Sequence, residues 1–384
     1  MIEKCMVCAS LRVASILNFG SVSPSSQSFF PKPTEIPKKH LDLWFCEDCF
    51  HIQNSAFDGY SEKHYGENYV VSLSHSPQAL KIYEGISRRL IEHLQLDRNA
   101  KIVEIGCGDG TFLATLVKIA GLEQASAFEP SGLFELAKSK PGLKVENRLY
   151  ASEDKKNPVD LLISRHVFEH VENPQLILNG VSAKAIYIEV PRIEDAMKHS
   201  MYADFYYDHI HYFTQSSFEV LLNRAGYEVA AWDIAPLDEW MGVIARPAQK
   251  PGRTKRERPQ FAAFVKNWAV FKIELSRQIA KLKTDGHRIA VWGAGARGVT
   301  LIDNLQLSRD SIDILVDSDP HKRGKFLPNS SWQVTNPETF FNNPTSVVLI
   351  TAATYAEEIR QTLISRLGAG RVKIFTLYPF RELS

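Results

Sequence analysis

The sequence predicts an α/β protein in which two Rossmann-like units follow a small cysteine-bearing module. Strands alternate with helices from residue 101 onward and again from residue 288, as in parallel, doubly wound sheets. A glycine-rich turn follows the first strand of each series, and two CxxC pairs precede both. A chain of 384 residues is long enough for two or three domains. We expect a cysteine module at 1–56, a first α/β domain at 57–250 and a second at 251–384.

The order of the elements follows from the spacing of apolar residues. Residues 1–56 carry few helix signals, and the Ser- and Pro-rich run at 21–37 indicates loops or short strands. Apolar residues recur at helical spacing at 78–94, 111–120, 131–140, 216–226, 261–283, 297–305 and 356–367. Short apolar runs predict strands at 102–105, 125–129, 159–165, 185–191, 227–234, 289–295, 312–317, 346–351 and 372–378. The polar, basic segment 246–259 is expected to be a linker.

Composition excludes several classes of protein. Lys and Arg total 45 against 44 Asp and Glu, so the overall charge does not favour a nucleic-acid partner. No apolar run approaches the length of about 18 residues that a membrane span needs. The first residues, MIEKCMVC, lack the basic and apolar regions of a secretion signal. We therefore expect a cytoplasmic protein without a nucleic-acid or membrane partner.

A glycine loop between the strand at 102–105 and the next helix indicates a nucleotide-like ligand. Gly106, Gly108 and Gly110 allow the backbone to turn tightly and to approach a ligand closely. Glu104 ends the strand and can accept a hydrogen bond from an ammonium group, and Glu129 ends the next strand and can bind two ribose hydroxyls. Together they favour S-adenosylmethionine. The spacing GxGxG differs from the GxGxxG of dinucleotide sites, which remain the alternative.

The cysteines form two pairs, Cys5 with Cys8 and Cys46 with Cys49, separated by 37 residues. In a long chain without a secretion signal, such pairs favour a metal over disulfides. Four thiolates fill the tetrahedral shell of Zn²⁺ and leave no open position, so we expect a structural zinc ion. The alternative is four reduced cysteines without metal. The fifth cysteine, Cys107, is expected to be a small buried residue.

These motifs resemble those of a known family. VEIGCGDGTFL, AFEPS and SRHVFEHVENP look like class I methyltransferase motifs. CMVC, ILNFGSVSPSSQSFF and WFCEDCFHIQ resemble the zinc-binding front module of the sugar C-methyltransferases, which methylate keto-deoxysugars carried on a nucleotide. VWGAGARGVTLIDNL, DSDPHKRGKFLP and LITAATYAEEI resemble the C-terminal domain of that family. The resemblance covers nearly the whole chain in the same domain order. It implies a class I methyltransferase domain between a zinc module and a second Rossmann-like domain.

Methylation at carbon requires a base that removes a proton next to a ketone, and histidine suits this role. The family carries a Tyr, an acid and a His ahead of a Tyr-Phe pair, and Tyr206, Asp208 and His209 match them. The resemblance implies His209 as the general base, Asp208 orienting it and Tyr206 bonding the developing oxyanion. His211 is a competing base. The family usually has Glu in place of Asp208 and His in place of Tyr207, so the substrate geometry can differ.

The resemblance also implies further residues of the reaction site. A His of the family occupies the place of His170, which we expect near the reacting carbon. Tyr65 and Tyr69 resemble a Tyr- and Ser-rich segment of the family, and we expect Tyr69 to cover the site. Simpler interpretations are a segment that packs on the sheet for His170 and an aromatic core or lid edge for the region around His209.

The second glycine turn, GAGARG at 293–298, is typical of a phosphate-binding turn at a helix start. Arg297 can add charge for a diphosphate, and Lys325 can assist, so the family resemblance implies that this domain helps to hold the nucleotide of the substrate. Asn329 and Ala353 depart from the family's usual Gly and Trp, which suggests a changed pocket. A second dinucleotide cofactor and domain packing without a ligand are the alternatives.

The sequence therefore predicts an S-adenosylmethionine-dependent C-methyltransferase whose small-molecule substrate is a nucleotide-linked keto-deoxysugar. One alternative keeps the methyl donor and transfers to oxygen or nitrogen. Another is a catalytically inactive, zinc-containing binding protein. The sequence does not indicate the sugar, its nucleotide or the oligomeric state.

Overall fold

The computed structural model describes residues 3–25, 27–59, 68–69, 76–234, 239–249, 257–377 and 380–383. The chain folds into two compact units, each assembled from three segments. The first contains Met1–Asn18, Asp42–Asp195 and His209–Pro259, and the second contains Phe19–Leu41, Ala196–Asp208 and Gln260–Ser384. The units therefore interleave in sequence, whereas the three expected modules are contiguous. The module boundaries at 56 and 250 stay a prediction.

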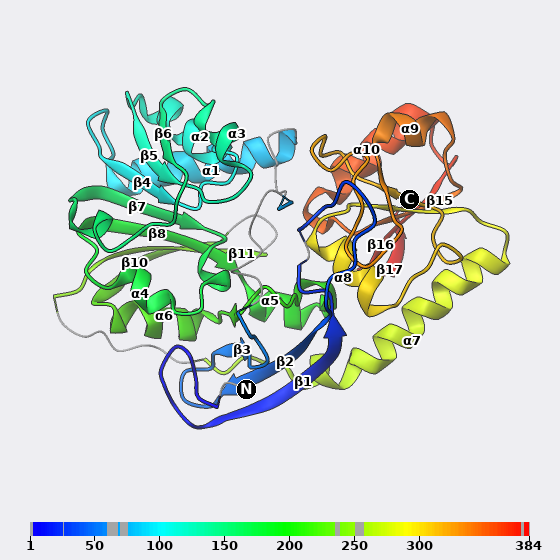
Figure 1. Cartoon of the computed structure of the whole chain (residues 1–384), viewed down its shortest axis with the longest axis horizontal. Coiled ribbons are helices and arrows are strands. Elements are labelled where there is room, and N and C mark those ends of the chain that lie inside the picture. The colour runs from blue at the N-terminus through cyan, green and yellow to red at the C-terminus, as the bar shows by residue number, and fades with distance from the viewer. Residues whose placement is uncertain are drawn as a thin grey trace. The chain divides into compact units, whose positions relative to one another are not determined.

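The first unit contains a seven-stranded sheet in the order β10-β11-β8-β7-β4-β5-β6 (Figure 1). Its strands are β4 (Ile102–Ile105), β5 (Ala125–Phe128), β6 (Leu143–Glu146), β7 (Val159–Arg165), β8 (Ala183–Pro191), β10 (Tyr227–Ile234) and β11 (Trp240–Pro247). β4 to β8 pair in parallel, and β11 inserts antiparallel between β8 and β10. The predicted class I methyltransferase fold is confirmed. The antiparallel strand β11 was not predicted from the sequence.

Helices cover both faces of this sheet. α1 (Pro77–Leu94) and α2 (Thr111–Ala120) share one apolar core with β4 and β5, and α4 (Pro174–Leu178) and α6 (Gln215–Arg224) share another with β7, β8 and β11 (Figure 1). α3 (Phe134–Lys138) precedes β6. Local chemistry explains the helix starts. Ser76 accepts a hydrogen bond from Ala79 N ahead of Pro77 at the start of α1, and Thr214 and Ser217 cap α6 reciprocally.

The second unit contains a six-stranded sheet in the order β14-β13-β12-β15-β16-β17. Its strands are β12 (Ile289–Trp292), β13 (Ile314–Val316), β14 (Val334–Thr335), β15 (Val347–Ile350), β16 (Lys373–Leu377) and β17 (Phe380–Leu383). All pairs are parallel except β16 with β17. The order of the parallel strands is that of a Rossmann-like fold, as predicted. α9 (Pro337–Asn342) and α10 (Ala356–Leu367) pack on one face, and α8 (Ala296–Asn304) follows β12.

A long helix, α7 (Ala262–Thr284), confirms the helix predicted over 261–283. Its residue Phe264 stacks on Tyr202 of the short 3₁₀ turn η4 (Tyr202–Asp204), with ring centroids 4.5 Å apart. The Tyr202 hydroxyl also donates to the Phe264 carbonyl over 2.7 Å. Within the second unit, these contacts join the segment 196–208 to the helix that begins the C-terminal part of the chain. α5 (Ile193–Lys198) leads into this segment.

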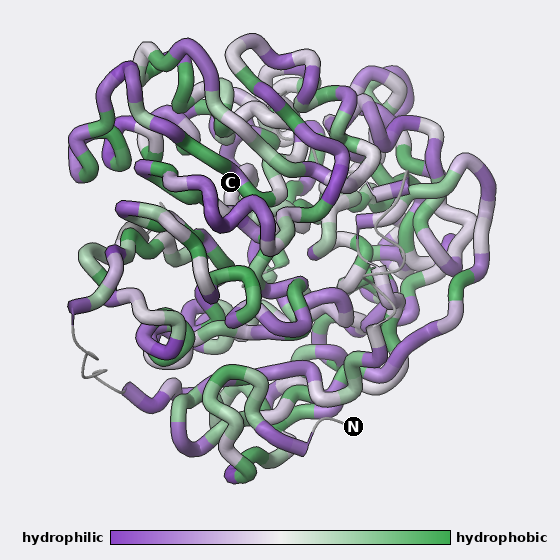
Figure 2. The backbone as a smooth tube through the Cα atoms, turned by 60° about the vertical axis from the view of Figure 1, so that its left-hand side comes forward, coloured by the Kyte–Doolittle hydropathy of each residue, from purple (hydrophilic) through white to green (hydrophobic). Residues whose placement is uncertain are grey.

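A third sheet has four strands in the order β1-β2-β3-β9. They are β1 (Val13–Val22), β2 (Lys39–Cys46), β3 (Ile52–Asn54) and β9 (His211–Tyr212). β3 pairs antiparallel with β9, so the cysteine-bearing N-terminal region and the segment after His209 share one sheet. Hydrophilic and hydrophobic stretches alternate along the chain in Figure 2, and no helix among the described residues is long and apolar enough to cross a membrane.

Candidate functional site

The first glycine loop connects β4 to α2 in a conformation that requires glycine. Gly106, Gly108 and Gly110 have φ of 69°, 57° and 74°, in the left-handed region that residues with a Cβ rarely adopt. A Cβ on Gly106 would lie 2.5 Å from Val167 Cγ2, and one on Gly110 would lie 3.1 Å from Ala137 Cα. The loop therefore combines a sharp turn with close packing, and it is the expected shape for a backbone that approaches a ligand.

Glu129 holds this loop from the end of β5. One carboxylate oxygen accepts a hydrogen bond from Gly108 N over 2.7 Å, and the other accepts from Ser131 N over 2.9 Å. Each carboxylate oxygen has a second lone pair, so both can also accept from hydroxyl groups of a ligand. Glu129 thus fits the predicted contact to the two hydroxyls of a ribose, while its present bonds fix the loop.

Glu104, in β4, is a buried acid with one oxygen that has no hydrogen-bond partner among the described residues. The residue is 2% exposed, and the oxygen concerned is Oε2. Burial, with Glu129 and Glu189 adding to it and Arg165 opposing it, raises the pKa of Glu104 to about 8. An unpartnered carboxylate in this position suits a cationic group. Glu129 can bind the hydroxyls of a ribose, and Glu104 can pair with an ammonium group. Together they fit S-adenosylmethionine, which carries both groups.

A buried network of charges lies where β7 and β8 end. Arg165 donates to Glu189 Oε1 through Nε over 3.0 Å and through Nη2 over 2.6 Å, and Tyr187 donates to Glu189 Oε2 over 2.9 Å. The Arg165 guanidinium also lies over the rings of Tyr83 and Phe112, at 4.8 Å and 4.2 Å from their centroids. The sequence analysis missed this pair. A glutamate within the apolar strand AIYIEVP was the available signal.

His166 extends the network. Its Nε2 lies 3.1 Å from Glu189 Oε1, and its Nδ1 lies 3.5 Å from Glu169 Oε1. Burial alone would lower the pKa of His166, but its hydrogen bonds to Glu169 and Glu189 raise it to about 9. Burial likewise opposes ionisation of Glu189, and Arg165 and His166 together lower the pKa of Glu189 to about 2. At neutral pH this part of the site carries two cations against its carboxylates.

The structure brings together two of the predicted reaction residues, His170 and His209. His170 ends the 3₁₀ turn η3 (Phe168–His170), and its ring lies at 86° to that of His209, with centroids 4.6 Å apart. A hydrogen bond of 2.7 Å from Ile210 N to the carbonyl of Glu169 holds the two segments together. His209 is 7% exposed, and burial, followed by the neighbouring His170 and His166, lowers its pKa well below the usual value. His209 is therefore a neutral imidazole at neutral pH.

The competing base, His211, is engaged elsewhere. It is 1% exposed, its Nε2 lies 3.0 Å from the carbonyl of Val171, and its Nδ1 lies 2.9 Å from Nε2 of His51. The carbonyl can only accept, so Nε2 of His211 carries the proton and Nδ1 accepts from His51. Burial lowers the pKa of His211 to about 4. This arrangement favours His211 as a structural link and leaves His209 as the better candidate for a base.

Tyr206, Asp208 and Arg297 belong to the second unit. The Tyr206 hydroxyl donates to Asp204 Oδ1 over 3.2 Å, and Arg297 forms a two-pronged ion pair with the same carboxylate, with Nη2 2.9 Å from Oδ2. Burial, with Asp204 adding to it, raises the pKa of Tyr206 well above its usual value. Asp208 is 3% exposed. Asp204 is a residue that the sequence analysis missed, since nothing in the local sequence marks it as the partner of Arg297.

The second glycine turn has the close approach expected of a phosphate-binding turn. Gly293 has φ of 114°, and a Cβ on Gly298 would collide with the carbonyl oxygen of Gly293. Asp317, after β13, accepts from Ala294 N over 2.7 Å and so fixes the turn. Lys325 is half-buried in the second unit, and Tyr69 is half-buried in the first. Tyr65 and half of the predicted linker, residues 250–256, lie outside the described residues.

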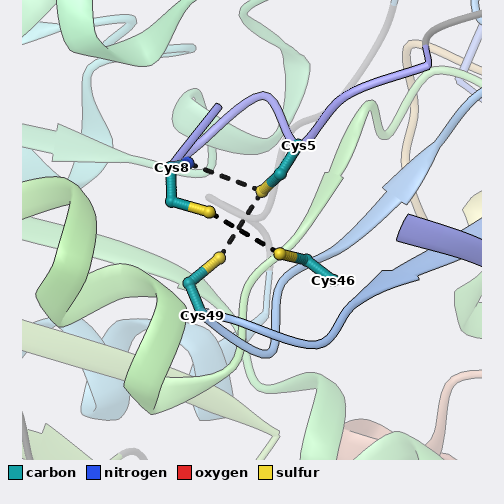
Figure 3. Close-up of side chains that lie close together, drawn as sticks. All are labelled: Cys5, Cys8, Cys46 and Cys49. Carbon is teal, nitrogen blue, oxygen red and sulfur yellow. Dashed lines mark hydrogen bonds between the residues drawn. The ribbon is translucent and has the colours of Figure 1, made fainter. Parts of the chain in front are cut away.

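The four predicted zinc ligands form one cluster. Figure 3 shows the sulfur atoms of Cys5, Cys8, Cys46 and Cys49 pointing toward a common centre, and they all lie within 4.8 Å of one another. Cys5 Sγ lies 3.5 Å from Cys49 Sγ, and Cys8 Sγ lies 3.6 Å from Cys46 Sγ. Tetrahedral zinc–thiolate bonds of about 2.3 Å place sulfur atoms about 3.8 Å apart. The spacing fits a zinc ion and is far too long for disulfides.

The sheet order and the glycine loop define the fold of a class I methyltransferase, and comparison with known proteins agrees. A family profile described as a methyltransferase domain matches residues 79–231, and one described as a C-methyltransferase C-terminal domain matches residues 249–377. The C-methyltransferase NovU of Streptomyces niveus is 25% identical over 290 residues, which cover 70% of this chain and 65% of NovU. The match thus spans slightly less than two thirds of that relative. The chain thus contains a methyltransferase domain followed by a domain similar to the C-terminal domain of C-methyltransferases.

Two of the solved structures that are similar to the chain share little sequence identity with it. The plantazolicin methyltransferase BpumL in complex with SAH has 17% sequence identity and a TM-score of 0.35, covering 45% of this chain and 84% of that one. A SAM-dependent methyltransferase from Aquifex aeolicus has 15% identity and a TM-score of 0.34, covering 45% and 94%.

The ion pair between Arg165 and Glu189 should be essential for stability. Replacement Glu189→Gln leaves the buried guanidinium without its countercharge, so we expect the free energy of unfolding to fall by about 3–5 kcal/mol. Urea denaturation followed by circular dichroism measures the loss. The control is Glu338→Gln, which breaks an exposed pair with Arg366 and should leave the denaturation midpoint unchanged. Equal midpoints for the wild type and Glu189→Gln would contradict the prediction.

Proposed function

We propose that the protein is a methyltransferase that uses S-adenosylmethionine to methylate a carbon atom of a nucleotide-linked keto-deoxysugar. The observation that carries the proposal is the donor loop with Glu104 and Glu129 in a chain whose C-terminal part matches a C-methyltransferase domain. The sugar and its nucleotide come from the family resemblance of the sequence motifs. A methyl transfer to oxygen or nitrogen keeps the same donor and is the second candidate.

The donor site is proposed to work through the two acids. Glu129 would bind the ribose hydroxyls with its remaining lone pairs, and Glu104 would pair with the ammonium of the methionine part. Bound S-adenosylmethionine supplies an electrophilic methyl group on a sulfonium, which an enolate carbon can take. The role of the glycine loop is to keep the backbone close to the ligand and to exclude side chains from that space.

His209 is proposed to remove the proton next to the ketone. Its imidazole is neutral at neutral pH, the form that can act as a base, and the hydrogen bonds of Ile210 and His211 hold this segment in position. His170 lies against it and is proposed to contact the substrate near the reacting carbon. The roles of Tyr206 at the oxyanion, of Asp208 in orienting the base and of Tyr69 as a cover stay predictions.

The second unit is proposed to hold the nucleotide. The tight turn at Gly293–Gly298 and the positive charge of Arg297 within it support this role. Because Arg297 is paired with Asp204, a diphosphate would have to compete with that carboxylate for the guanidinium. Lys325 is proposed to assist as a second cation.

The reaction is tested by incubating a panel of nucleotide-linked ketosugars with a donor labelled in its methyl group. We expect one labelled methyl on carbon in the product, located by mass spectrometry and NMR. Failure to bind S-adenosylmethionine in calorimetry would instead support the inactive binding protein, and a methyl found on oxygen or nitrogen would support the second candidate.

Proton abstraction is tested separately by deuterium exchange from solvent at the carbon next to the ketone. Replacement His209→Ala should reduce the exchange rate by about 10²–10⁴-fold, since the general base is lost. His321→Ala, which removes an exposed imidazole of the second unit, should exchange at the wild-type rate. Undiminished exchange in His209→Ala would refute the assignment of the base.

Donor binding should release a proton. The pKa of Glu104 is about 8, so the free carboxyl is mostly protonated at pH 7, and pairing with an ammonium group converts it to the carboxylate. We expect close to one proton released per donor bound, measured by calorimetry at pH 7 in buffers of different ionisation enthalpy. Glu104→Gln should bind the donor more weakly and with heat independent of the buffer. Buffer-independent heat in the wild type would contradict the prediction.

The zinc ion is proposed to be structural. Cys8→Ser should lower the bound zinc from about one ion per chain to near zero and should lower the melting temperature, because the metal contributes folding free energy. Elemental analysis and thermal denaturation measure the two effects. The control is Cys107→Ser, which alters the cysteine outside the cluster and should retain the ion. A metal-free wild-type protein with normal stability would show that the cluster is four reduced cysteines.

A further inference from the structure

Three side chains near the proposed base form a second cluster of potential metal ligands. We propose that Glu169, His170 and His209 bind a divalent transition-metal ion, and that a bound ion blocks the base by occupying the imidazole of His209. One ligand atom from each of the three residues lies within 4.8 Å of the other two. The site is distinct from the four cysteines in both residues and chemistry.

The distances are close to those of a formed site. Metal–ligand bonds of about 2.1 Å place neighbouring ligand atoms about 3.0 Å apart in an octahedron and about 3.4 Å apart in a tetrahedron. Side chains whose ligand atoms lie within 4.8 Å therefore need to move by little more than about 1 Å, which rotation of the imidazole and carboxylate groups supplies.

The backbone already aligns the two segments that provide the ligands. Ile210 N donates to the carbonyl of Glu169 over 2.7 Å, directly beside two of the ligands. His211 bonds the carbonyl of Val171 over 3.0 Å, directly beside the third. Ligands separated in sequence are thus presented together before an ion arrives, which lowers the entropic cost of binding.

Glu169 provides the independent sign of a missing cation. The residue is 1% exposed, and its Oε2 has no hydrogen-bond partner among the described residues. A buried acceptor without a partner costs about 1–3 kcal/mol, and more for a charged group. Its other oxygen, Oε1, lies 3.5 Å from Nδ1 of His166. Residues that contact a metal ligand without binding the metal often fix the orientation of that ligand, and His166 can do so for Glu169. Glu169 therefore combines a buried, unpartnered oxygen with a carboxylate oxygen that lies within 4.8 Å of ligand atoms of both imidazoles.

The donor set indicates which ion would bind. Two imidazole nitrogens and one carboxylate oxygen suit Zn²⁺, Co²⁺, Ni²⁺ or Fe²⁺ and are poorly suited to Mg²⁺ or Ca²⁺. Three protein ligands leave positions for water or for an oxygen of the substrate. The lone pair of His209 that would bind the ion is the one that would accept the proton, so the two uses exclude each other. The inhibitory effect rests on the proposed function. Binding of the ion does not depend on that function.

Binding is tested by titrating Co²⁺ into the full-length protein with zinc present at the cysteines. Co²⁺ held by imidazole and carboxylate gives weak visible bands, whereas displacement of zinc from the cysteines would give intense sulfur-to-metal charge-transfer bands. We expect about one Co²⁺ per chain without thiolate bands, and at least tenfold weaker binding in Glu169→Gln. His321→Ala is the matched control for binding by a surface histidine and should keep the wild-type affinity.

Absence of this Co²⁺ signal in the wild type, or equal affinity in the wild type and Glu169→Gln, would overturn the site. Circular dichroism establishes that the variant is folded, and His170→Asn serves as the second ligand variant if Glu169→Gln is not. Each of these variants that is folded must lose affinity for the proposal to stand.

Inhibition is tested by the deuterium exchange of the substrate. Co²⁺ should suppress exchange in the wild type, and a chelator should restore it. Whatever exchange Glu169→Gln retains should be insensitive to Co²⁺ at concentrations that suppress the wild type. Undiminished exchange by the Co²⁺-loaded protein would overturn the inhibitory effect. Co²⁺ binding together with no exchange even without metal would count against the proposed base and leave the metal site supported.

Discussion

The buried ion pair between Arg165 and Glu189 is the interaction on which the proposed reaction centre depends. It joins the ends of the two adjacent strands β7 and β8, and its guanidinium lies over aromatic rings from α1 and α2. Burying these charges is costly, and the close contacts among Arg165, Glu189, His166 and Tyr187 help to compensate for the loss of water. The neighbouring strand β11 leaves room for the Tyr187 side chain by carrying a glycine, Gly242. A Cβ at this position would lie 2.5 Å from the Tyr187 hydroxyl.

This network also sets the electrostatic character of the proposed reaction centre. His166 has φ of 54°, an uncommon conformation for a residue with a side chain, and its imidazole lies between two carboxylates. The same carboxylates hold His166 as a cation, whereas burial keeps His209 neutral. Two histidines of one unit therefore differ in charge at neutral pH. The difference arises because hydrogen bonds to Glu169 and Glu189 raise the pKa of His166, whereas burial and the neighbouring His170 and His166 lower the pKa of His209.

The N-terminal cysteine region contributes more than a separate small module would. β3, which follows Cys49, pairs with β9, and His51 bonds His211 between these strands. His211 in turn bonds the carbonyl of Val171, directly after His170. Within the first unit, a chain of contacts thus runs from the cysteine cluster to the two histidines of the proposed reaction centre. A metal ion at the cysteines would stiffen the strand that begins this chain, although the ion itself would lie outside the reaction centre.

The sequence by itself determined the features whose cause is local. Three glycines at two-residue spacing predicted a left-handed turn, which the structure contains, and two CxxC pairs predicted a cluster of four cysteines, which it also contains. Apolar periodicity likewise predicted both Rossmann-like sheets, because each repeat lies within one helix or strand. Only the tertiary structure decided which distant residues meet. Glu169 lies beside His209, His51 bonds His211 across 160 positions, and Arg297 pairs with Asp204. β9 has two residues, too few for a periodic pattern, and the partner of a buried charge is chosen by packing rather than by spacing along the chain.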